Sequence, residues 1–462
     1  MGRTLSPCTV ILLLTALATA PAAPTPDPTE TVIRLEVTPM AAPRPALKYQ
    51  LLPEVREMQP GQAVQNYLKC FMEQNFFFFH KDAEDRRERY LVMPLADLPV
   101  KEIRKEYGGN VGLKQADYAA RLDTVDWQIL PVIRRDGMNT LLPEVQQMRR
   151  LAAALKVRFR AEVAERRFDD AIRTAKTVFA LGRAHGEHPT LIAGLVGVAI
   201  SFMGVGPLEE MVGQPGCPNL YWALTNLPAP LVEFRKGVQG ERFILGVDLA
   251  GLDDPAPKGA EELKRIVGNL KELFRYESPK VDAAGYVADK AGDAAHVKAA
   301  RRRLLDAGLP AKDVAKYLPE QVVLVDEKLT FEAERDEVAK AVLLPHPEME
   351  RVLAGLSARK GDEGLFHRMV PATRKVKLAH TRLAQRLAML RVVEALRLHA
   401  AEEGEFPPKL ADVRVPLPAD QFSGRAFEYK VEGGKAHLRG AVPAGYEKNG
   451  GFNVRYELTL RK

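Results

Sequence analysis

The sequence predicts a mainly α-helical protein, in which helical hairpins surround one buried apolar helix and a small C-terminal α+β module follows. Three observations lead to this fold class. Residues 190–208 contain no charged side chain, and a helix that is apolar all round must be buried. Two segments with helical apolar periodicity precede it, between residues 143 and 186. Residues 452–460 alternate between apolar and polar, which is typical of a half-buried strand.

The first residues have the layout of a secretory signal peptide. Arg3 precedes an apolar run from Val10 to Leu17, and small alanine residues follow up to Ala23. This run is too short to span a bilayer as a permanent anchor. We therefore expect residues 1–23, with Cys8, to be removed from an exported protein that is periplasmic or extracellular.

Residues 24–45 are rich in proline, alanine and threonine and have no sustained apolar period. This composition predicts a flexible linker between the cleavage site and the folded protein. The helical body is predicted over residues 46–370 and the α+β module over 371–462. The overall composition, with 46% hydrophobic and 27% charged residues, is that of a globular protein.

The centre of the body is predicted to be a unit of three helices. Pro143 suits a first helical turn, and apolar residues then recur at steps of three and four. After a turn capped by Asp169, a second amphipathic helix runs to Gly186. The apolar helix begins at Thr190.

The apolar segment has nearly the length of a membrane-spanning helix, but its composition favours burial within protein. Four glycines interrupt it, and Pro207, followed by Glu209 and Glu210, closes it without a basic anchor. We expect no stable membrane span, and a membrane-bound form remains the alternative.

The C-terminal module is predicted to consist of a long helix and a short antiparallel sheet. The helix covers KVKLAHTRLAQRLAMLRVVEALRLHAAEEG, and Gly433–Gly434 forms a tight turn between two strands. In the final strand one face is apolar; it consists of Phe452, Val454, Tyr456, Leu458 and Leu460. A helix packed on a small sheet buries both apolar faces.

Two cysteines, Cys70 and Cys217, remain after removal of the signal peptide. Export would permit a disulfide, although two separate buried thiols are expected. The formal net charge is +7. Since nucleic acid is not expected as a partner of an exported protein, the expected partners are other proteins of the cell envelope, and the oligomeric state stays open.

Two short segments resemble known structural families. RFRAEVAERRFDDAIRTAKTVFAL resembles one tetratricopeptide-type helix pair, chiefly in its RRFDDAI turn. ALRLHAAEEGEFPPKLADV and PLPADQFSGRAFEY resemble the globular part of type II secretion pseudopilins. The first resemblance implies an antiparallel helix hairpin, and the second implies only the small C-terminal fold.

A broader resemblance covers most of the body. ADYAARLDTVDWQIL, RRFDDAIRTAKTVFALGRAHGEHPTLIAGLVGVAI and QPGCPNLYWALTNLP are similar to a family of uncharacterised exported proteins of planctomycete bacteria. The resemblance implies a single architecture and export. It implies no catalytic residue.

No nucleophile elbow, P-loop, dinucleotide-binding glycine motif or HExxH motif occurs in the chain. Ser357 lacks the glycine pattern of a nucleophile elbow. The best metal candidate is the group His185, Glu187 and His188, although no other histidine cluster completes a ligand set and a polar turn between helices explains it as well.

Other candidate groups have simple structural explanations. The segment His346–Arg351 fits the first turn of a helix, and Glu209 with Glu210 would need a special environment to act as an acid/base pair. The aromatic run Phe76–Phe79 suggests either a ligand platform or the end of a core helix, and the latter is favoured. Arg301–Arg303 suggests a solvated helix face, with a surface for an acidic partner as the alternative.

The sequence thus offers no catalytic, cofactor-binding or metal-ligating residue that we would assign. We expect an exported, non-catalytic interaction or scaffold component of the cell envelope. The alternative is a secreted hydrolase whose site is assembled from residues distant in sequence, with the region around His185 as the first place to examine.

Overall fold

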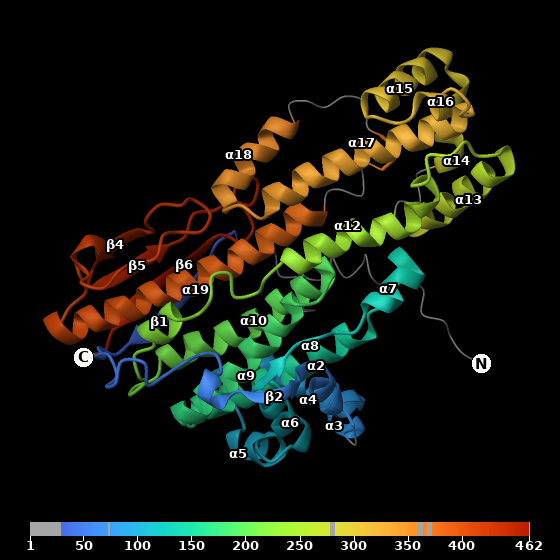
Figure 1. Ribbon diagram of the computed structural model, residues 1–462. Coiled ribbons are helices and arrows are strands. Elements are labelled where there is room, and N and C mark those ends of the chain that lie inside the picture. Colours follow the sequence, from blue (N-terminus) through green and yellow to red (C-terminus); the bar gives the residue numbers. More distant parts are fainter. Residues whose placement is uncertain (1–28, 73, 278–281, 358–363, 367–371, 462) are drawn as a thin grey trace. The chain divides into compact units, whose positions relative to one another are not determined.

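The structure is a computed structural model that describes residues 29–72, 74–277, 282–357, 364–366 and 372–461. The protein is mainly α-helical, and its one four-stranded sheet among the described residues is small (Figure 1), so the predicted fold class is confirmed. The expected signal peptide, residues 1–23, lies outside the described residues. So do the first five residues of the expected linker.

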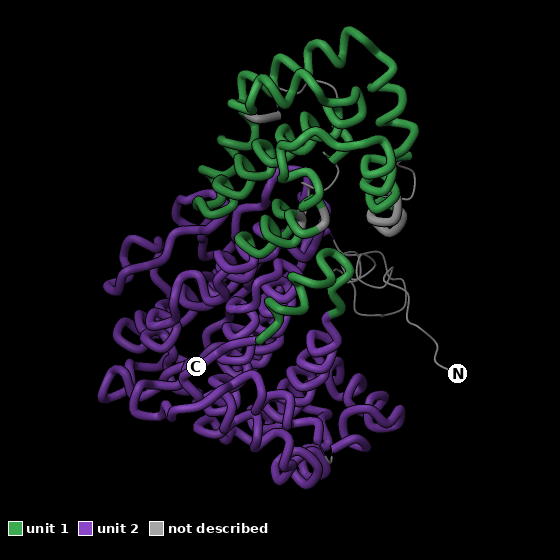
Figure 2. Tube along the Cα trace, turned by 45° about the vertical axis from the view of Figure 1, so that its right-hand side comes forward, with its two compact units in different colours: residues 1–23, 128–141, 238–376 green, residues 24–127, 142–237, 377–462 purple. Residues whose placement is uncertain are grey.

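The chain forms two compact units, which are described separately (Figure 2). The described part of unit 1 falls within residues 128–141 and 238–376, and that of unit 2 within 29–127, 142–237 and 377–461. This division differs from the predicted boundary at residue 370. The C-terminal module belongs to the same unit as the central helices because its long helix and its sheet pack against them, as shown below.

Unit 2 contains the sheets and the central helices. Its elements are β1 (Thr31–Val37), β2 (Gln59–Gln62), α2 (Ala63–Lys69), α3 (Asn75–Phe79), α4 (Lys81–Val92), α5 (Val100–Ile103), α6 (Val111–Ala119), β3 (Leu122–Thr124), α8 (Pro143–Ala164), α9 (Phe168–Gly186), α10 (Leu191–Val212), α11 (Tyr221–Thr225), most of α19 (Ala372–Glu403), β4 (Glu428–Glu432), β5 (Lys435–Arg439) and β6 (Val454–Leu460). A π-helical turn, Arg104–Gly108, extends α5.

The helices α8, α9 and α10 pack on one another, as expected from the periodicity of the first two and the apolar composition of the third. Pro143 opens α8, where its missing N–H costs nothing. Asp169 lies in the first turn of α9 and is not its cap, because the helix begins one residue earlier, at Phe168. There its carboxylate faces the positive end of the helix dipole.

The contact between α9 and α10 depends on glycine. A Cβ atom on Gly182 would lie 2.3 Å from the Oγ of Ser201, and one on Gly197 would lie 2.6 Å from the carbonyl oxygen of Gly182. Since real side chains do not come so close, both positions require glycine for this helix separation. Gly206, also in α10, has no such neighbour.

Among the described residues, α10 is long and apolar enough to cross a membrane, by length and composition alone. Of its most apolar stretch of 18 residues, 72% is buried in the structure. The expectation that Pro207 ends this helix is wrong, because α10 continues to Val212. Its last turn is held by burial of Met211 and Val212 and by the ion pair of Glu209 with Arg386. Such tertiary contacts offset the backbone hydrogen bond that proline removes.

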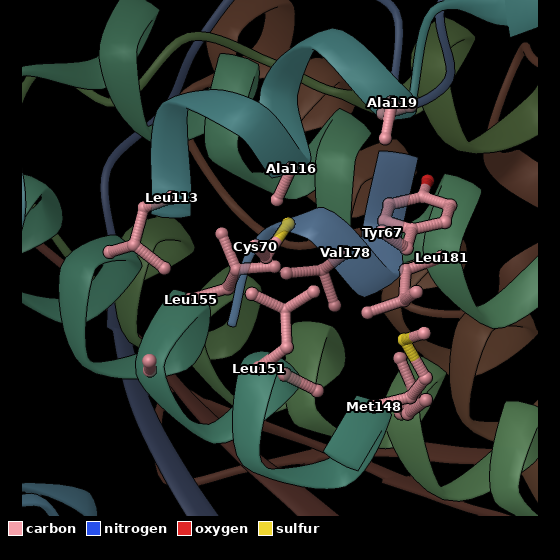
Figure 3. Close-up of a cluster of buried hydrophobic side chains, with 14 of the residues drawn as sticks. Tyr67, Cys70, Leu113, Ala116, Ala119, Met148, Leu151, Leu155, Val178 and Leu181 are labelled. Carbon is pink, nitrogen blue, oxygen red and sulfur yellow. The ribbon is translucent and has the colours of Figure 1, made fainter. Parts of the chain in front are cut away.

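A hydrophobic core of unit 2 includes side chains of α2, α6, α8 and α9 (Figure 3). Leu151 and Leu155 of α8 point toward Cys70 and Val178, and all four side chains are fully buried. Cys70 and Cys217 are free thiols, so the expected pair of separate buried cysteines is found.

The sheet has the strand order β1-β6-β5-β4. β4 and β5 form an antiparallel hairpin in which Glu432 pairs with Lys435, so Gly433 and Gly434 make the two-residue turn. Both glycines have positive φ (+58° and +78°), as such a turn requires. The predicted apolar face of β6 is confirmed for Val454, Tyr456 and Leu458, which are buried.

The strand β1 corrects the prediction of a flexible linker over residues 24–45. Residues 31–37 lie at the edge of the sheet and pair in parallel with β6, from Thr31 opposite Val454 to Val37 opposite Leu460. Leu35 and Val37 are buried. A parallel partner more than 400 residues away supplies the hydrogen bonds, and the proline-rich flanks conceal the short alternating segment.

Unit 1 is helical. Its elements are α7 (Leu130–Asp136), most of α12 (Arg235–Leu249), α13 (Ala260–Glu277), α14 (Ala283–Gly292), α15 (Ala294–Asp306), α16 (Ala311–Val314), α17 (Pro319–Val342) and α18 (His346–Ser357). The helices α14 and α15 pack on α17, and Phe274, Phe331 and Phe366 meet in the core of this unit.

Candidate functional site

The group His185, Glu187 and His188 does not form a metal site. The Nδ1 atom of His185 lies 2.8 Å from the carbonyl oxygen of Leu181, and that of His188 lies 2.9 Å from the Oγ1 atom of Thr190. Both rings are buried. Glu187 instead forms an ion pair of 2.6 Å with Lys236. Among the residues that the structure describes, no three potential ligands gather around a common point.

The two histidines help to anchor Trp127. Its indole ring lies edge-on to the ring of His185 (centroid distance 4.9 Å) and to that of His188 (5.0 Å). Its Nε1–H donates to the carbonyl oxygen of Ala184. Burial lowers the pKa of His185 to about 4, so this ring is neutral at pH 7. The motif RAHGEHPT therefore packs the end of α9 in unit 2.

Glu209 and Glu210 face different partners. Glu209 accepts hydrogen bonds from the Nε atom of Arg386 at 2.5 Å and from the hydroxyl of Tyr456, and burial raises the pKa of Tyr456 well above its usual value. Glu210 accepts from Arg160 at 2.6 Å. The two carboxylates thus link α10 to α19 and β6, and to α8. They do not act on each other as an acid/base pair.

The remaining polar candidates also support the fold. His346 opens α18 and is buried, and Glu350 pairs with Arg374 at 2.6 Å. Arg301 donates to carbonyl oxygens of residues 314, 315 and 317, and Arg303 pairs with Asp326. Two of the three arginines therefore hold unit 1 together and do not form a free basic face. Ser357 ends α18, and its side chain lies outside the described residues.

A buried ion pair in α19 was not anticipated from the sequence. Arg397 donates to both carboxylate oxygens of Glu394, at 2.9 Å each, and both side chains are fully buried. Arg397 also donates to the carbonyl oxygens of Thr38 and Cys217, and Glu394 accepts from the backbone N–H of Leu220. The sequence feature that could have revealed this ion pair is the spacing of Glu394 and Arg397, two opposite charges three residues apart in the otherwise largely apolar stretch RVVEALRLHA.

The aromatic run of α3 divides between the core and the surface. Phe77 and Phe78 are buried, and the guanidinium of Arg87 donates to the carbonyl oxygens of both residues. Phe77 and Phe78 thus belong to the core, but they lie in a separate five-residue helix and not at the end of a longer core helix. Phe76 and Phe79 remain 63% and 36% exposed.

Phe76 and Phe79 belong to a group of exposed apolar side chains that we call the α2–α3 patch. Its other members are Leu68 of α2 and Met72 of the following turn, which are 38% and 67% exposed. The ring of Phe76 stacks on that of His80, and Arg150 lies over the ring of Phe79. Phe76 and Phe79 thus each contact another side chain of unit 2, and Phe79 also packs on the buried Phe71.

Two of the hollows among the described residues offer most room for a ligand. In unit 2 a groove of about 600 Å³ runs along residues 50–56 and the end of α11. In unit 1 a cavity of about 340 Å³ is lined by α14, α15 and α17, with Tyr286, His296, Asp326 and Glu327 among its walls. Tyr286 donates to Glu327 at 2.7 Å, and the Nε2 atom of His296 is buried without a hydrogen-bond partner among the described residues.

Comparison of the chain with protein-family models, curated proteins and solved structures gives no match. The resemblances described above therefore stay predictions. The site has to be judged on its own geometry, which comprises ion pairs that serve the fold, the α2–α3 patch and the two hollows described above.

Proposed function

We propose that the chain is an exported, non-catalytic component of the cell envelope that acts by binding other envelope proteins. The observation that supports this most is the α2–α3 patch, because four large apolar side chains are exposed within the twelve residues 68–79, and exposed apolar side chains in such number are typical of protein–protein contact surfaces. Aromatic residues and methionine are enriched in such surfaces, and Phe76 and Met72 are the most exposed members of the patch.

The state of the ionisable residues agrees with this proposal. The carboxylates that the sequence offered for chemistry, Glu209 and Glu210, have partners within the fold, and the ring of His185 is fully buried. A catalytic base or nucleophile would need access to a substrate. A surface that binds by apolar contact has no such requirement.

The experiment is chemical cross-linking and affinity capture of the tagged, full-length chain in its native cell envelope. We expect one stoichiometric partner with the wild type, and loss of that partner with the double variant Met72→Ser/Phe76→Ser. Val92→Ser is the matched control, since Val92 is 81% exposed at the end of α4, outside the patch. A free monomer with measurable turnover would contradict the proposal.

The alternative is a secreted hydrolase, and one observation in unit 1 favours it. The cavity beside α17 brings His296 together with Glu327 from a different helix, so a site assembled from distant residues would lie there and not at His185. The unpartnered Nε2 atom of His296 would serve as the base that accepts a proton from water.

A screen of ester, peptide and glycoside substrates tests this alternative. It requires activity in the wild type that His296→Asn removes and that the control His399→Asn, in unit 2, retains. Absence of any hydrolysis by the wild type, or activity that survives His296→Asn, would exclude this site.

A further inference from the structure

The groove of unit 2 is lined by residues that do not belong to the α2–α3 patch. Its floor and walls come from three places in the chain: the segment before β2, the outer face of α9, and the loop after α11. The lining residues are Gln50, Leu51, Leu52, Pro53, Glu54, Val55, Arg56, Arg183, Ala223, Asn226, Leu227 and Pro228. Its volume of about 600 Å³ falls within the range of roughly 300–1,000 Å³ that is typical of ligand pockets.

The floor of the groove is rigid. The Nε2 atom of Gln50 donates to the carbonyl oxygen of Leu47, and its Oε1 atom accepts from Asn226 at 2.7 Å. Gln50 and Leu51 are buried. Both ends of the Gln50 amide are therefore bonded within unit 2, which fixes this part of the floor.

The walls are apolar and accessible. Val55 is 91% exposed, and Leu52, Leu227 and Pro228 are partly or fully open to solvent. The backbone N–H of Leu52 makes no hydrogen bond to another described residue. A ligand with both apolar groups and a hydrogen-bond acceptor therefore fits this wall.

Of the three charged residues that line the groove, one cation has no partner of opposite charge among the described residues. Glu54 and Arg56 neutralise each other through hydrogen bonds of 2.7 and 3.1 Å. Arg183, in the last turn of α9, is exposed and forms no ion pair or side-chain hydrogen bond with another described residue. A guanidinium beside apolar walls favours a carboxylate, which it can bind through two parallel hydrogen bonds.

We propose that this groove binds an extended segment of a partner polypeptide, in which apolar side chains flank a carboxylate. The apolar residues pack on Leu52, Val55 and Leu227, and the carboxylate pairs with Arg183. The inference rests on the proposed role in protein binding, but it concerns a second contact surface. It makes the chain a component with two separate contact sites on unit 2.

The test uses the full mature chain and a fluorescent peptide of alternating valine and aspartate residues, with binding measured by fluorescence anisotropy. We expect the peptide to bind, and a peptide of alternating valine and asparagine to bind at least about fivefold more weakly. Arg183→Glu should weaken binding of the aspartate peptide about tenfold or more, because it turns attraction into repulsion. Arg183→Lys should restore part of the affinity.

Arg89→Glu is the matched control, since Arg89 is an exposed arginine of unit 2 in the last turn of α4, outside the groove. It should change the affinity less than twofold. Leu227→Ser should weaken both peptides, and circular dichroism checks that each variant is folded. Failure of the aspartate peptide to bind, equal binding of the two peptides, or indifference to Arg183→Glu would overturn the proposal.

A second copy of this chain is the other occupant to exclude. If the wild type self-associates in analytical sedimentation and Arg183→Glu alone makes it monomeric, the groove binds a second copy of this chain and the proposal is wrong. Met72→Ser/Phe76→Ser should bind the aspartate peptide like the wild type. Loss of captured partners in that variant therefore tests the α2–α3 patch, while loss of peptide binding in Arg183→Glu tests the groove.

Discussion

Replacement of Arg397 by methionine should strongly destabilise unit 2. Methionine is long and apolar and can occupy much of the same space, but it leaves the carboxylate of Glu394 with the N–H of Leu220, at 3.1 Å, as its remaining partner. Both members of the pair are fully buried. Breaking such a pair by removal of one partner costs about 3–5 kcal/mol, because a charge stays buried without compensation.

The double variant Glu394→Gln/Arg397→Met separates this cause from simple loss of contacts. It removes the uncompensated charge but still loses the hydrogen bonds of Arg397 to the carbonyl oxygens of Thr38 and Cys217. We expect it to be more stable than Arg397→Met alone by about 1 kcal/mol or more. Arg414→Met is the control, since this arginine is 71% exposed and its ion pairs contribute about 1 kcal/mol at most.

Urea unfolding followed by tryptophan fluorescence measures these effects. The chain has two tryptophans, Trp127 and Trp222, and both belong to unit 2, so the signal reports that unit. If Arg397→Met unfolds within about 1 kcal/mol of the wild type, or if the double variant is the less stable one, the pair is not the buried charge network described here.

Three further predictions concern the same unit. Burial lowers the pKa of His185 and of His380 to about 4, so as the pH falls from about 6.5 the unfolded chain takes up protons before the folded chain does. The free energy of unfolding should therefore decrease between pH 6.5 and 4, by about 3 kcal/mol per histidine at most. A urea midpoint that is constant over this pH range would contradict the prediction. Gly182→Ala and Gly197→Ala should each lower the free energy of unfolding, measured in urea, by about 1–3 kcal/mol because a Cβ atom does not fit between α9 and α10. Gly206→Ala should be neutral or stabilising by up to about 1 kcal/mol. Equal effects at the three sites would refute the close packing. Burial raises the pKa of the thiols of Cys70 and Cys217 to about 12, so the mature, folded protein should not react with a thiol reagent at pH 8, and after denaturation without reductant both thiols should react; fewer than two would indicate a disulfide.

The sequence was informative where a local pattern decides the structure. The helices α8 and α9 follow from apolar periodicity, and the Gly433–Gly434 turn follows from the backbone conformation that only glycine adopts easily. The burial of α10 follows from its lack of charge.

The sequence could not reveal contacts between residues that lie far apart in the chain. Nothing near Thr31–Val37 indicates that β6 lies beside it, so a strand was taken for a linker. Nor does local periodicity show which charged residues meet inside a fold, as Glu209 meets Arg386 and Tyr456 across three elements. The prediction that the helix ends at Pro207 was wrong for the same reason, because contacts from other elements stabilise the last turn of α10.

The candidate site shows the same limit. A run of four phenylalanines has no periodicity of its own, so the sequence could not tell the buried Phe78 from the exposed Phe76. The groove beside Arg183 needs three segments that are brought together only by folding. What the sequence did indicate was that His185, Glu187 and His188 suit a structural turn.

The central claim, that the α2–α3 patch binds another envelope protein, is tested most directly by site-specific photo-crosslinking. A photoreactive phenylalanine analogue replaces Phe76 in one variant and Val92 in another, and both are irradiated in the native envelope. Our account predicts one discrete cross-linked product from position 76, of the same mass as the captured complex, and none from position 92. No product at position 76, or the same products at both positions, would contradict it.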